Sequence, residues 1–234
     1  MIHPQDARIF VEYPVLVPGH KIAYWPVPKN ACTSLKYAFY ALRTGMEFIP
    51  LKVGCRYIYH IHRIFPSRPF KAIPLASDWV KLAIVRDPLE RLVSSYCNRV
   101  LYHSDLARHQ LQLQAKNLKR CPSFPEFVEN LDMYRAISKS IRYHTNPQVE
   151  FLGHDPSYFD VLISVKELKD LPNRIGLPAL RLPKKQDGGR EYKAVATSSI
   201  DSELRAKILN DFREDYEVFG EFFQSSPVST ARGE

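Results

Sequence analysis

Glycine and cysteine are scarce in this 234-residue chain, which contains 9 and 4 of them. The glycine-rich motif Gly-x-x-x-x-Gly-Lys-Ser/Thr does not occur, and its absence excludes a Walker A phosphate loop. Cys32, Cys55, Cys97 and Cys121 lack the spacing of zinc ligands and do not resemble the disulfide framework of a secreted protein. We interpret Cys32 as a packing residue, because no partner base that would make it a nucleophile is evident.

Long apolar runs are absent as well. No stretch approaches the roughly twenty residues needed to span a bilayer. The first residues, Met1 to Asp6, lack the charged and then apolar pattern of a signal peptide. We therefore expect a soluble chain, either a cytoplasmic bacterial enzyme or the soluble catalytic domain of a membrane-anchored parent.

The formal net charge is +8, which favours an anionic ligand. Nucleic acid is the rival explanation of this charge. The basic residues are dispersed, however, and we find no nucleic-acid-binding module and no arginine-rich run, so no nucleic-acid partner is predicted. The length fits one domain with a continuous core, predicted over residues 1–224, followed by a disordered tail at 225–234. Oligomeric state cannot be inferred from these features.

The most informative segment joins an apolar run at 21–27 to a helical pattern at 33–44 through a Pro-Lys corner. Thr33 or Ser34 is expected to cap that helix. Such a turn directs backbone N–H groups, a helix N-terminus and the Lys29 ammonium to one point, which predicts a phosphate or sulfate site. The alternative is an ordinary capped surface helix with a lysine beside it.

A second segment has the same design. Residues 81–85 are predicted as a buried strand, and Asp87 and Pro88 fit the N-cap and first position of a following helix. Arg86 stands at the carboxyl end of the strand, where open α/β sheets bind ligands, and Ser94 lies about two turns along the helix. Arg86 and Ser94 together fit a second phosphate. In the alternative interpretation, Arg86 pairs with a carboxylate and Ser94 is simply solvated.

Between these segments, residues 57–62 alternate as a strand does, which puts His60 and His62 on one face. Histidine is the side chain that supplies a neutral base near pH 7. Half of a metal site is a second interpretation, but no nearby cluster of Cys, Asp or Glu completes it. A purely structural pair of histidines is the third.

Two sequences carry a family resemblance: Pro-Lys-Asn-Ala-Cys-Thr-Ser at 28–34 and Val-Arg-Asp-Pro-Leu-Glu-Arg-Leu-Val-Ser-Ser-Tyr at 85–96. Together they resemble the two nucleotide-binding motifs of sulfotransferases, which use 3′-phosphoadenosine 5′-phosphosulfate as donor. The resemblance is strongest to the carbohydrate branch, which includes Golgi glycan enzymes and heparan sulfate 2-O-sulfotransferase. It implies an α/β fold with a three-layer parallel sheet flanked by helices, of the P-loop nucleotide-hydrolase-like sulfotransferase type.

The resemblance also implies roles for the two motifs. Arg86 and Ser94 would hold the 3′-phosphate. The 5′-phosphosulfate would be held by the first motif, that is by Lys29, Asn30, Ala31, Cys32, Thr33 and Ser34. Lys29 would in addition stabilise the bridging oxygen of the leaving nucleotide, 3′,5′-adenosine bisphosphate.

Three further segments are similar to the family. Tyr-His-Ile-His at 59–62 is similar to the Tyr-His-x-His segment of the 2-O-sulfotransferases, which implies that His62, with His60 as the alternate, accepts the proton of an acceptor hydroxyl. His144 and Gln148 lie in a His-x-x-Pro-Gln segment and would line the acceptor cleft. The family closes a loop over the nucleotide, and the corresponding loop here offers three cations, Lys184, Arg190 and Lys193, of which we assign Lys193 to the nucleotide.

The chemistry implied is in-line sulfuryl transfer, in which catalysis is mostly positioning and neutralisation of spread negative charge. A sulfuryl group carries less charge than a phosphoryl group, so we predict no metal. The implied acceptor is a carbohydrate or a glycolipid. Thr145 stands where Golgi members usually carry Trp, so acceptor identity is not transferred from them. A small-molecule kinase and a non-catalytic binder of anionic glycans are the alternatives.

Predicted elements alternate between strand and helix, which argues for a parallel sheet with helices on both faces. The predicted strands are 21–27, 56–62, 80–85 and 159–165. The predicted helices are 33–44, 87–103, 124–131, 134–144, 167–175 and 201–219, with an exposed helix or lid at 104–121.

Overall fold

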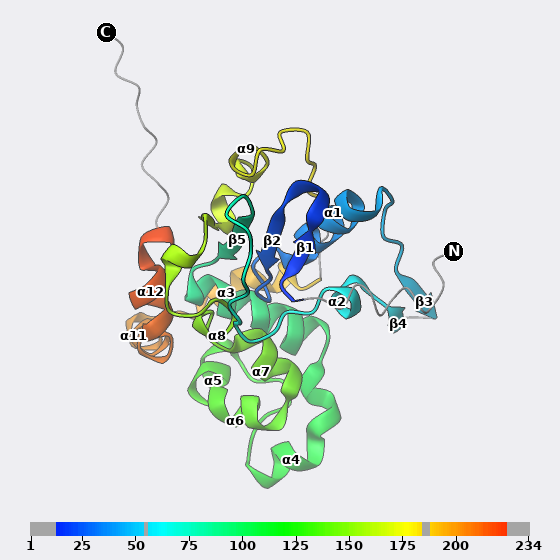
Figure 1. The fold of residues 1–234 in the computed structure, drawn as a ribbon. Coiled ribbons are helices and arrows are strands. Elements are labelled where there is room, and N and C mark those ends of the chain that lie inside the picture. Colours follow the sequence, from blue (N-terminus) through cyan, green and yellow to red (C-terminus); the bar gives the residue numbers. More distant parts are fainter. Residues whose placement is uncertain (1–12, 54–55, 184–187, 224–234) are drawn as a thin grey trace.

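A computed structural model describes residues 13–53, 56–183 and 188–223 (Figure 1). Its central sheet has the strand order β1-β2-β5-β6. Three of these strands run parallel, and the edge strand β1 pairs antiparallel with β2. The strands are β1 (Val15–Val17), β2 (Ile22–Trp25), β5 (Val80–Val85) and β6 (Val161–Ser164). A separate hairpin consists of β3 (Leu51–Val53) and β4 (Arg56–Tyr59).

The helices around the sheet are mostly short. The α-helices are α1 (Cys32–Thr44), α2 (Ile61–Ile64), α3 (Pro88–Ser95), α4 (Gln110–Ala115), α5 (Phe124–Glu129), α6 (Leu131–Ile137), α7 (Lys139–Thr145), α8 (Val149–Leu152), α9 (Leu171–Arg174), α10 (Lys193–Ser198), α11 (Ser202–Asp211) and α12 (Arg213–Phe223). A π-helix, η3 (Tyr96–Tyr102), continues α3. The 3₁₀-helices are η2 (Pro18–His20), η4 (Asp105–His109), η5 (Pro156–Tyr158), η6 (Val165–Glu167) and η7 (Arg190–Tyr192).

Both faces of the sheet are covered, as its apolar strands require. On one face Tyr24 and Ile84 pack against α1, with Leu35 and Phe39 in the same buried cluster. On the other face Trp25 and its neighbours pack against α8 and α12. The molecule is therefore a mixed α/β protein with a parallel-dominated sheet between helices, as the sequence predicts, but the antiparallel edge strand β1 was not predicted.

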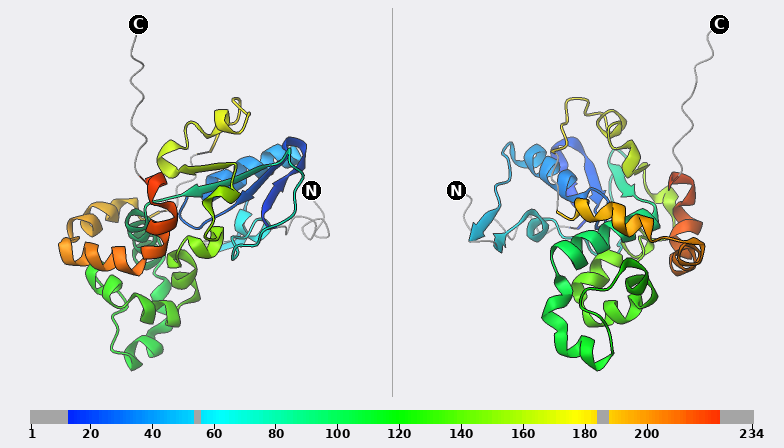
Figure 2. Two further views of the ribbon diagram at one scale, coloured as in Figure 1. Left: turned by 60° about the vertical axis from the view of Figure 1, so that its left-hand side comes forward. Right: turned by 180° about the vertical axis from the view of Figure 1, so that it is seen from behind.

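A third buried cluster lies away from the sheet. It joins α3 and η3 to α5, α6, α7, α10 and α11. Figure 2 shows this part of the chain as a helical lobe to one side of the sheet. Helix α3 belongs to the lobe and starts directly after β5, so it connects the lobe to the sheet.

The pairing register explains where a site can form. Trp25 lies opposite Ala83, and Val85 lies opposite Ser164. Because β2, β5 and β6 are parallel, the segments that follow them leave the sheet at the same edge. The two predicted anion-binding turns, at 27–33 and 85–88, are thus side by side although more than fifty residues separate them.

Three of the four predicted strands are confirmed, as β2, β5 and β6. The strand predicted at 56–62 is wrong beyond Tyr59, and its pairing is with β3 and not with the central sheet. The chain turns at His60, whose side chain caps α2 by accepting a hydrogen bond from the backbone N–H of His62 (3.4 Å). The two imidazoles are stacked, with ring centroids 4.8 Å apart, so a helix cap and not a strand face brings them together.

Long predicted helices are divided in the structure. The helix predicted at 87–103 changes from α to π at Tyr96. The helix at 134–144 breaks at Ser138, whose side chain accepts from the N–H of Ile141 and so starts α7. The helix at 201–219 breaks between α11 and α12, and 104–121 forms η4 and α4. Lys184 and the tail predicted to be disordered at 225–234 lie outside the described residues.

Candidate active site

The turn between β2 and α1 is built on two residues with left-handed backbone. Lys29 has φ 71° and Ala31 has φ 56°, both in a region that non-glycine residues seldom adopt. The Asn30 N–H returns to the Val27 carbonyl (3.3 Å) and closes the turn. Alternation of this kind points successive N–H groups into one concavity, which suits an anion.

Helix α1 begins at this turn without a side-chain cap, so the cap predicted at Thr33 or Ser34 is wrong. The Thr33 hydroxyl is hydrogen-bonded to the ring of His62 instead. Ala31 occupies the N-cap position and has no side-chain acceptor to offer. The N–H groups of the first turn of α1 are therefore left for an acceptor from outside the helix.

The turn between β5 and α3 is capped as predicted. The Asp87 carboxylate accepts from the N–H of Glu90 (2.9 Å), and Pro88 takes the first helical position. Arg86 lies just before the cap. Its guanidinium donates to the Lys29 carbonyl (3.2 Å) and lies 3.6 Å from the Glu90 carboxylate, and burial lowers its pKa below the usual arginine value.

Buried amides hold the two turns together. The Asn30 side chain donates to the Ile84 carbonyl (2.8 Å) and to Gln148 Oε1 (2.6 Å). Gln148 Oε1 also accepts from the N–H of Arg86 (3.0 Å), and its Nε2 donates to the Arg86 carbonyl (2.8 Å). Arg91, buried on α3, donates to the Pro28 carbonyl (3.0 Å). The backbone of each turn is thus fixed by side chains from the other parts of the fold.

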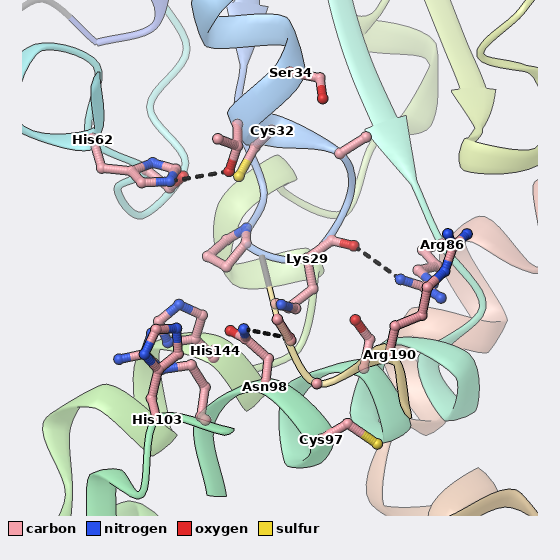
Figure 3. A pocket seen from close by; sticks show the side chains of 18 of the residues that line it. Lys29, Cys32, Ser34, His62, Arg86, Cys97, Asn98, His103, His144 and Arg190 are labelled. Atoms are coloured by element: carbon pink, nitrogen blue, oxygen red, sulfur yellow. Dashed lines mark hydrogen bonds between the residues drawn. The ribbon is translucent and has the colours of Figure 1, made fainter. Parts of the chain in front are cut away.

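A cavity of about 700 Å³ opens at this edge of the sheet, and its volume is typical of a small-molecule site. Figure 3 shows side chains from several elements around it. It is lined by Pro28, Lys29, Ala31, Cys32, Thr33, Ser34, His60, His62, Ser67, Arg86, Ser94, Cys97, Asn98, Arg99, His103, Tyr143, His144, Val165, Gly188, Gly189, Arg190 and Lys193. Lys29 and Arg86 line this same cavity although they follow different strands.

Most of the residues nominated from the sequence meet here, including Lys193. Asn30 and Gln148 are the exceptions, since both are fully buried, bond inward and do not line the cavity. Asn30 was predicted to hold the 5′ end and Gln148 to line the acceptor cleft. The structure gives both side chains a supporting position behind the turns.

His62 lies in a chain of hydrogen bonds. Its Nε2 is 3.1 Å from the Thr33 hydroxyl, and its Nδ1 is 3.1 Å from the Lys36 ammonium. Lys36 is fully buried and also donates to the Ser67 hydroxyl (3.2 Å). Burial lowers the pKa of Lys36 to about 8, and burial with the Lys36 charge lowers the pKa of His62 to about 2. At neutral pH Lys36 is therefore charged and His62 is neutral.

The segment at 188–193 closes one side of the cavity by lying on the π-helix. Asn98 donates to the Gly188 carbonyl (3.0 Å; Figure 3). Gly189 has φ 98°, and a Cβ there would stand 2.5 Å from the Cys97 carbonyl oxygen, so only glycine fits this contact. The contact positions Arg190 and Lys193 at the cavity wall.

Sequence reasoning missed several lining residues. Ser67, Arg99 and His103 belong to no motif, and Tyr143 directly precedes the His-x-x-Pro-Gln segment but was not nominated. Asn98 recurs at helical spacing with Arg91 and Ser94, and this spacing was the one available signal.

Among the described residues, no group of three or more His, Cys, Asp or Glu is arranged to hold a metal ion. Within the same ranges, no helix combines the length and the apolar character required to cross a membrane.

Comparison with known proteins gives two matches. The family model described as "Sulfotransferase family" matches residues 15–223. Carbohydrate sulfotransferase 8 of Mus musculus is 27% identical over 153 residues, which cover 58% of this chain and 35% of the relative. The chain thus spans about a third of the curated relative that it matches. No solved structure matches significantly.

Proposed function

The chain belongs to the sulfotransferase family, and from this premise we propose that it moves a sulfuryl group from 3′-phosphoadenosine 5′-phosphosulfate to a hydroxyl of a carbohydrate or glycolipid. One observation carries the proposal. Lys29 and Arg86 follow two parallel strands, line one cavity and are joined by a hydrogen bond. The name of the mouse relative supports a carbohydrate acceptor. The P-loop nucleotide-hydrolase-like form of the fold is part of this proposal.

The residues present fit the nucleotide at both ends. The uncapped start of α1 and the left-handed Lys29 and Ala31 form an anion-binding concavity for the 5′-phosphosulfate, with Cys32, Thr33 and Ser34 in the first turn. The backbone of Asn30 belongs to the same turn. Arg86 and Ser94 suit the 3′-phosphate, because a guanidinium and a hydroxyl are both donors. Lys193, with Arg190 beside it, adds positive charge at the cavity wall.

The protein's own groups then account for catalysis. When bound, the nucleotide supplies the sulfuryl group and a good leaving group. Lys29 and the turn N–H groups stabilise the negative charge that develops on the bridging oxygen, and such preorganised stabilisation is usually the main source of rate acceleration. A histidine of the cavity accepts the proton of the acceptor hydroxyl. The sequence assigns this step to His62, with His60 as the alternate, and these assignments stay predictions.

A thermal-shift comparison tests the nucleotide part of the proposal. We expect 3′,5′-adenosine bisphosphate to stabilise the chain and ATP to leave its melting temperature unchanged. The reverse order of effects would favour a small-molecule kinase.

Transfer of label from sulfur-labelled donor to a panel of glycans and glycolipids then separates an enzyme from a binder. Lys29→Ala should reduce transfer about 10²–10³-fold. Lys139→Ala, an exposed lysine on α7, is the matched control. Nucleotide binding without label transfer to any hydroxyl acceptor would contradict the enzymatic proposal.

A further inference from the structure

The partners of the His62 ring determine which ring nitrogen donates and which accepts. Lys36 is an ammonium with no lone pair, so it donates to His62 Nδ1 (3.1 Å). A neutral imidazole carries one proton, which must then lie on Nε2, and Nε2–H donates to the Thr33 hydroxyl oxygen (3.1 Å). Both ring nitrogens of His62 are thus engaged within the protein, and the Thr33 hydroxyl keeps its own proton to donate into the cavity.

His60 is arranged in a similar way. Its Nδ1 accepts from the backbone N–H of His62 (3.4 Å). In the neutral ring the proton consequently lies on Nε2, which makes that nitrogen a donor. In this arrangement, neither histidine of the 59–62 segment directs a lone pair to an acceptor hydroxyl.

His144 is the opposite tautomer. Its Nδ1 is 2.8 Å from the Ser140 carbonyl oxygen, one turn earlier on α7. A carbonyl can only accept, so the proton lies on Nδ1 and Nε2 holds the lone pair. Among the described residues no hydrogen bond reaches His144 Nε2, and His144 lines the cavity with Lys29 and His62 (Figure 3).

The surroundings keep this ring neutral. Burial, and then the positive charges of Arg99, Lys29 and Arg91, lower the pKa of His144 to about 3, whereas its bond to Ser140 acts in the opposite direction. Both His144 and His62 are therefore uncharged at neutral pH, so the choice between them rests on their hydrogen bonds and not on their pKa values.

We propose that Nε2 of His144, rather than a ring nitrogen of His62, accepts the proton of the acceptor hydroxyl, while His62 holds the Thr33 hydroxyl as a donor toward the anionic group. The inference rests on the sulfuryl transfer proposed above. His144 Nε2 takes the proton as the acceptor oxygen forms its bond to sulfur. The bond between sulfur and the bridging phosphate oxygen breaks, and that oxygen keeps the electron pair. His144 would be a catalytic residue and His62 a positioning residue.

The first test does not depend on activity. Long-range proton–nitrogen NMR spectra of the labelled full chain report which ring nitrogen carries hydrogen. We expect the Nδ1–H tautomer at His144 and the Nε2–H tautomer at His62, with the signals assigned from the His144→Asn and His62→Gln variants. An Nε2–H tautomer at His144 would overturn the inference.

The second test uses the same amide variants as a matched pair. His144→Asn keeps an N–H near the Nδ1 position but removes the lone pair, and His62→Gln keeps an N–H that can reach Thr33. We expect His144→Asn to lose about 10²–10⁴-fold in transfer, with affinity for 3′,5′-adenosine bisphosphate within about threefold of the wild type. His62→Gln should lose less than about tenfold in transfer. His154→Asn, at an exposed histidine outside the cavity, is the control.

Chemical rescue separates a lost base from a lost contact. Added imidazole should restore part of the transfer by His144→Ala and none of that by His62→Ala. Rescue of His62→Ala alone, or a larger loss in His62→Gln than in His144→Asn, would assign the base to His62 and overturn the inference. A wild-type chain that does not bind 3′,5′-adenosine bisphosphate would instead refute the proposed function itself.

Discussion

The two strand-to-helix turns of the sheet begin their helices in opposite ways. At β5–α3 the Asp87 carboxylate satisfies the first turn of the helix, so the protein itself provides the acceptor. At β2–α1 no side chain does so, and Lys29 and Ala31 adopt left-handed backbone. The β5–α3 unit therefore presents side chains to the cavity, Arg86 from the turn and Ser94 from the helix, whereas the β2–α1 turn presents its backbone N–H groups and Lys29. Two turns that look alike in sequence thus offer different donors, which is why the proposed function assigns them to different ends of the nucleotide.

Each helix also buries one cation, and here too they differ. Lys36 on α1 bonds to the side chains of His62 and Ser67, whereas Arg91 on α3 bonds to the carbonyls of Pro28 and Asn146. Burial lowers both pKa values, to about 8 for Lys36 and to about 10 for Arg91. Only the lysine loses its charge at moderately alkaline pH.

The largest expected effect concerns Lys36. Its pKa in the folded state lies below the ordinary lysine value of 10.5, so between pH 8 and 10.5 the unfolded state binds more protons and stability rises with pH. Below pH 8 the full cost of the buried charge is present. We expect the stability of Lys36→Met relative to the wild type to fall by about 2 to 3 kcal/mol between pH 7 and pH 10. Urea unfolding at a series of pH values measures this difference, and a pH-independent difference would contradict it.

The next effect separates the two anion sites. Arg86→Ala should weaken binding of 3′,5′-adenosine bisphosphate about 10- to 100-fold, because it removes hydrogen bonds from a charged donor. Binding of adenosine 5′-phosphate, which lacks the 3′-phosphate, should change by less than about threefold. Calorimetry measures both affinities. Arg174→Ala, on α9 outside the cavity, is the control, and an equal loss for both nucleotides would show that Arg86 does not distinguish them.

A smaller effect distinguishes the capped from the uncapped helix. Asp87→Ala should lower the free energy of unfolding by about 1 kcal/mol, since it removes an N-cap hydrogen bond. Ser34→Ala should change it by less than about 0.5 kcal/mol, because Ser34 does not cap α1. Denaturant unfolding of the two variants provides the measurement. Equal losses would mean that Ser34 caps α1 in solution.

The smallest effect concerns Ala31. Glycine there relieves the left-handed conformation but increases the freedom of the unfolded chain, so the free energy of unfolding should change by less than about 0.5 kcal/mol. Ala38→Gly, in the interior of α1, should cost about 1 kcal/mol. Denaturant unfolding again measures both changes. A similar loss in both variants would argue that Ala31 is not strained.

Local signals predicted the three parallel strands of the central sheet but not its antiparallel edge strand β1. Strands β2, β5 and β6 are apolar runs that end in turn residues, and such runs are buried in any parallel sheet. The prediction of a strand over 56–62 was wrong beyond Tyr59, because alternating aromatic and histidine residues also fit a short strand followed by a helix cap. The choice between them depends on the hydrogen bond from the His62 N–H to His60, which is invisible to periodicity.

Positions at the cavity were predicted for residues that lie in a motif next to a strand end. The residues predicted in this way that do line the cavity include Lys29, Thr33, Arg86 and Ser94. Gln148 was placed in an acceptor cleft because a motif says nothing of which way a side chain points. In the fold its amide matches the backbone of Arg86 and the side chain of Asn30, so it is drawn inward.

By itself the sequence determined three things: the parallel strands that are buried on both faces, the two polar turns at the carboxyl ends of β2 and β5, and the family to which the chain belongs. These are local properties, since hydrophobic runs, caps and motifs act within a few residues. Only the tertiary structure decided the tautomers of His62 and His144, because a tautomer depends on the partner that the fold brings to each ring nitrogen. Lys36 makes Nδ1 of His62 an acceptor, whereas the Ser140 carbonyl makes Nδ1 of His144 a donor.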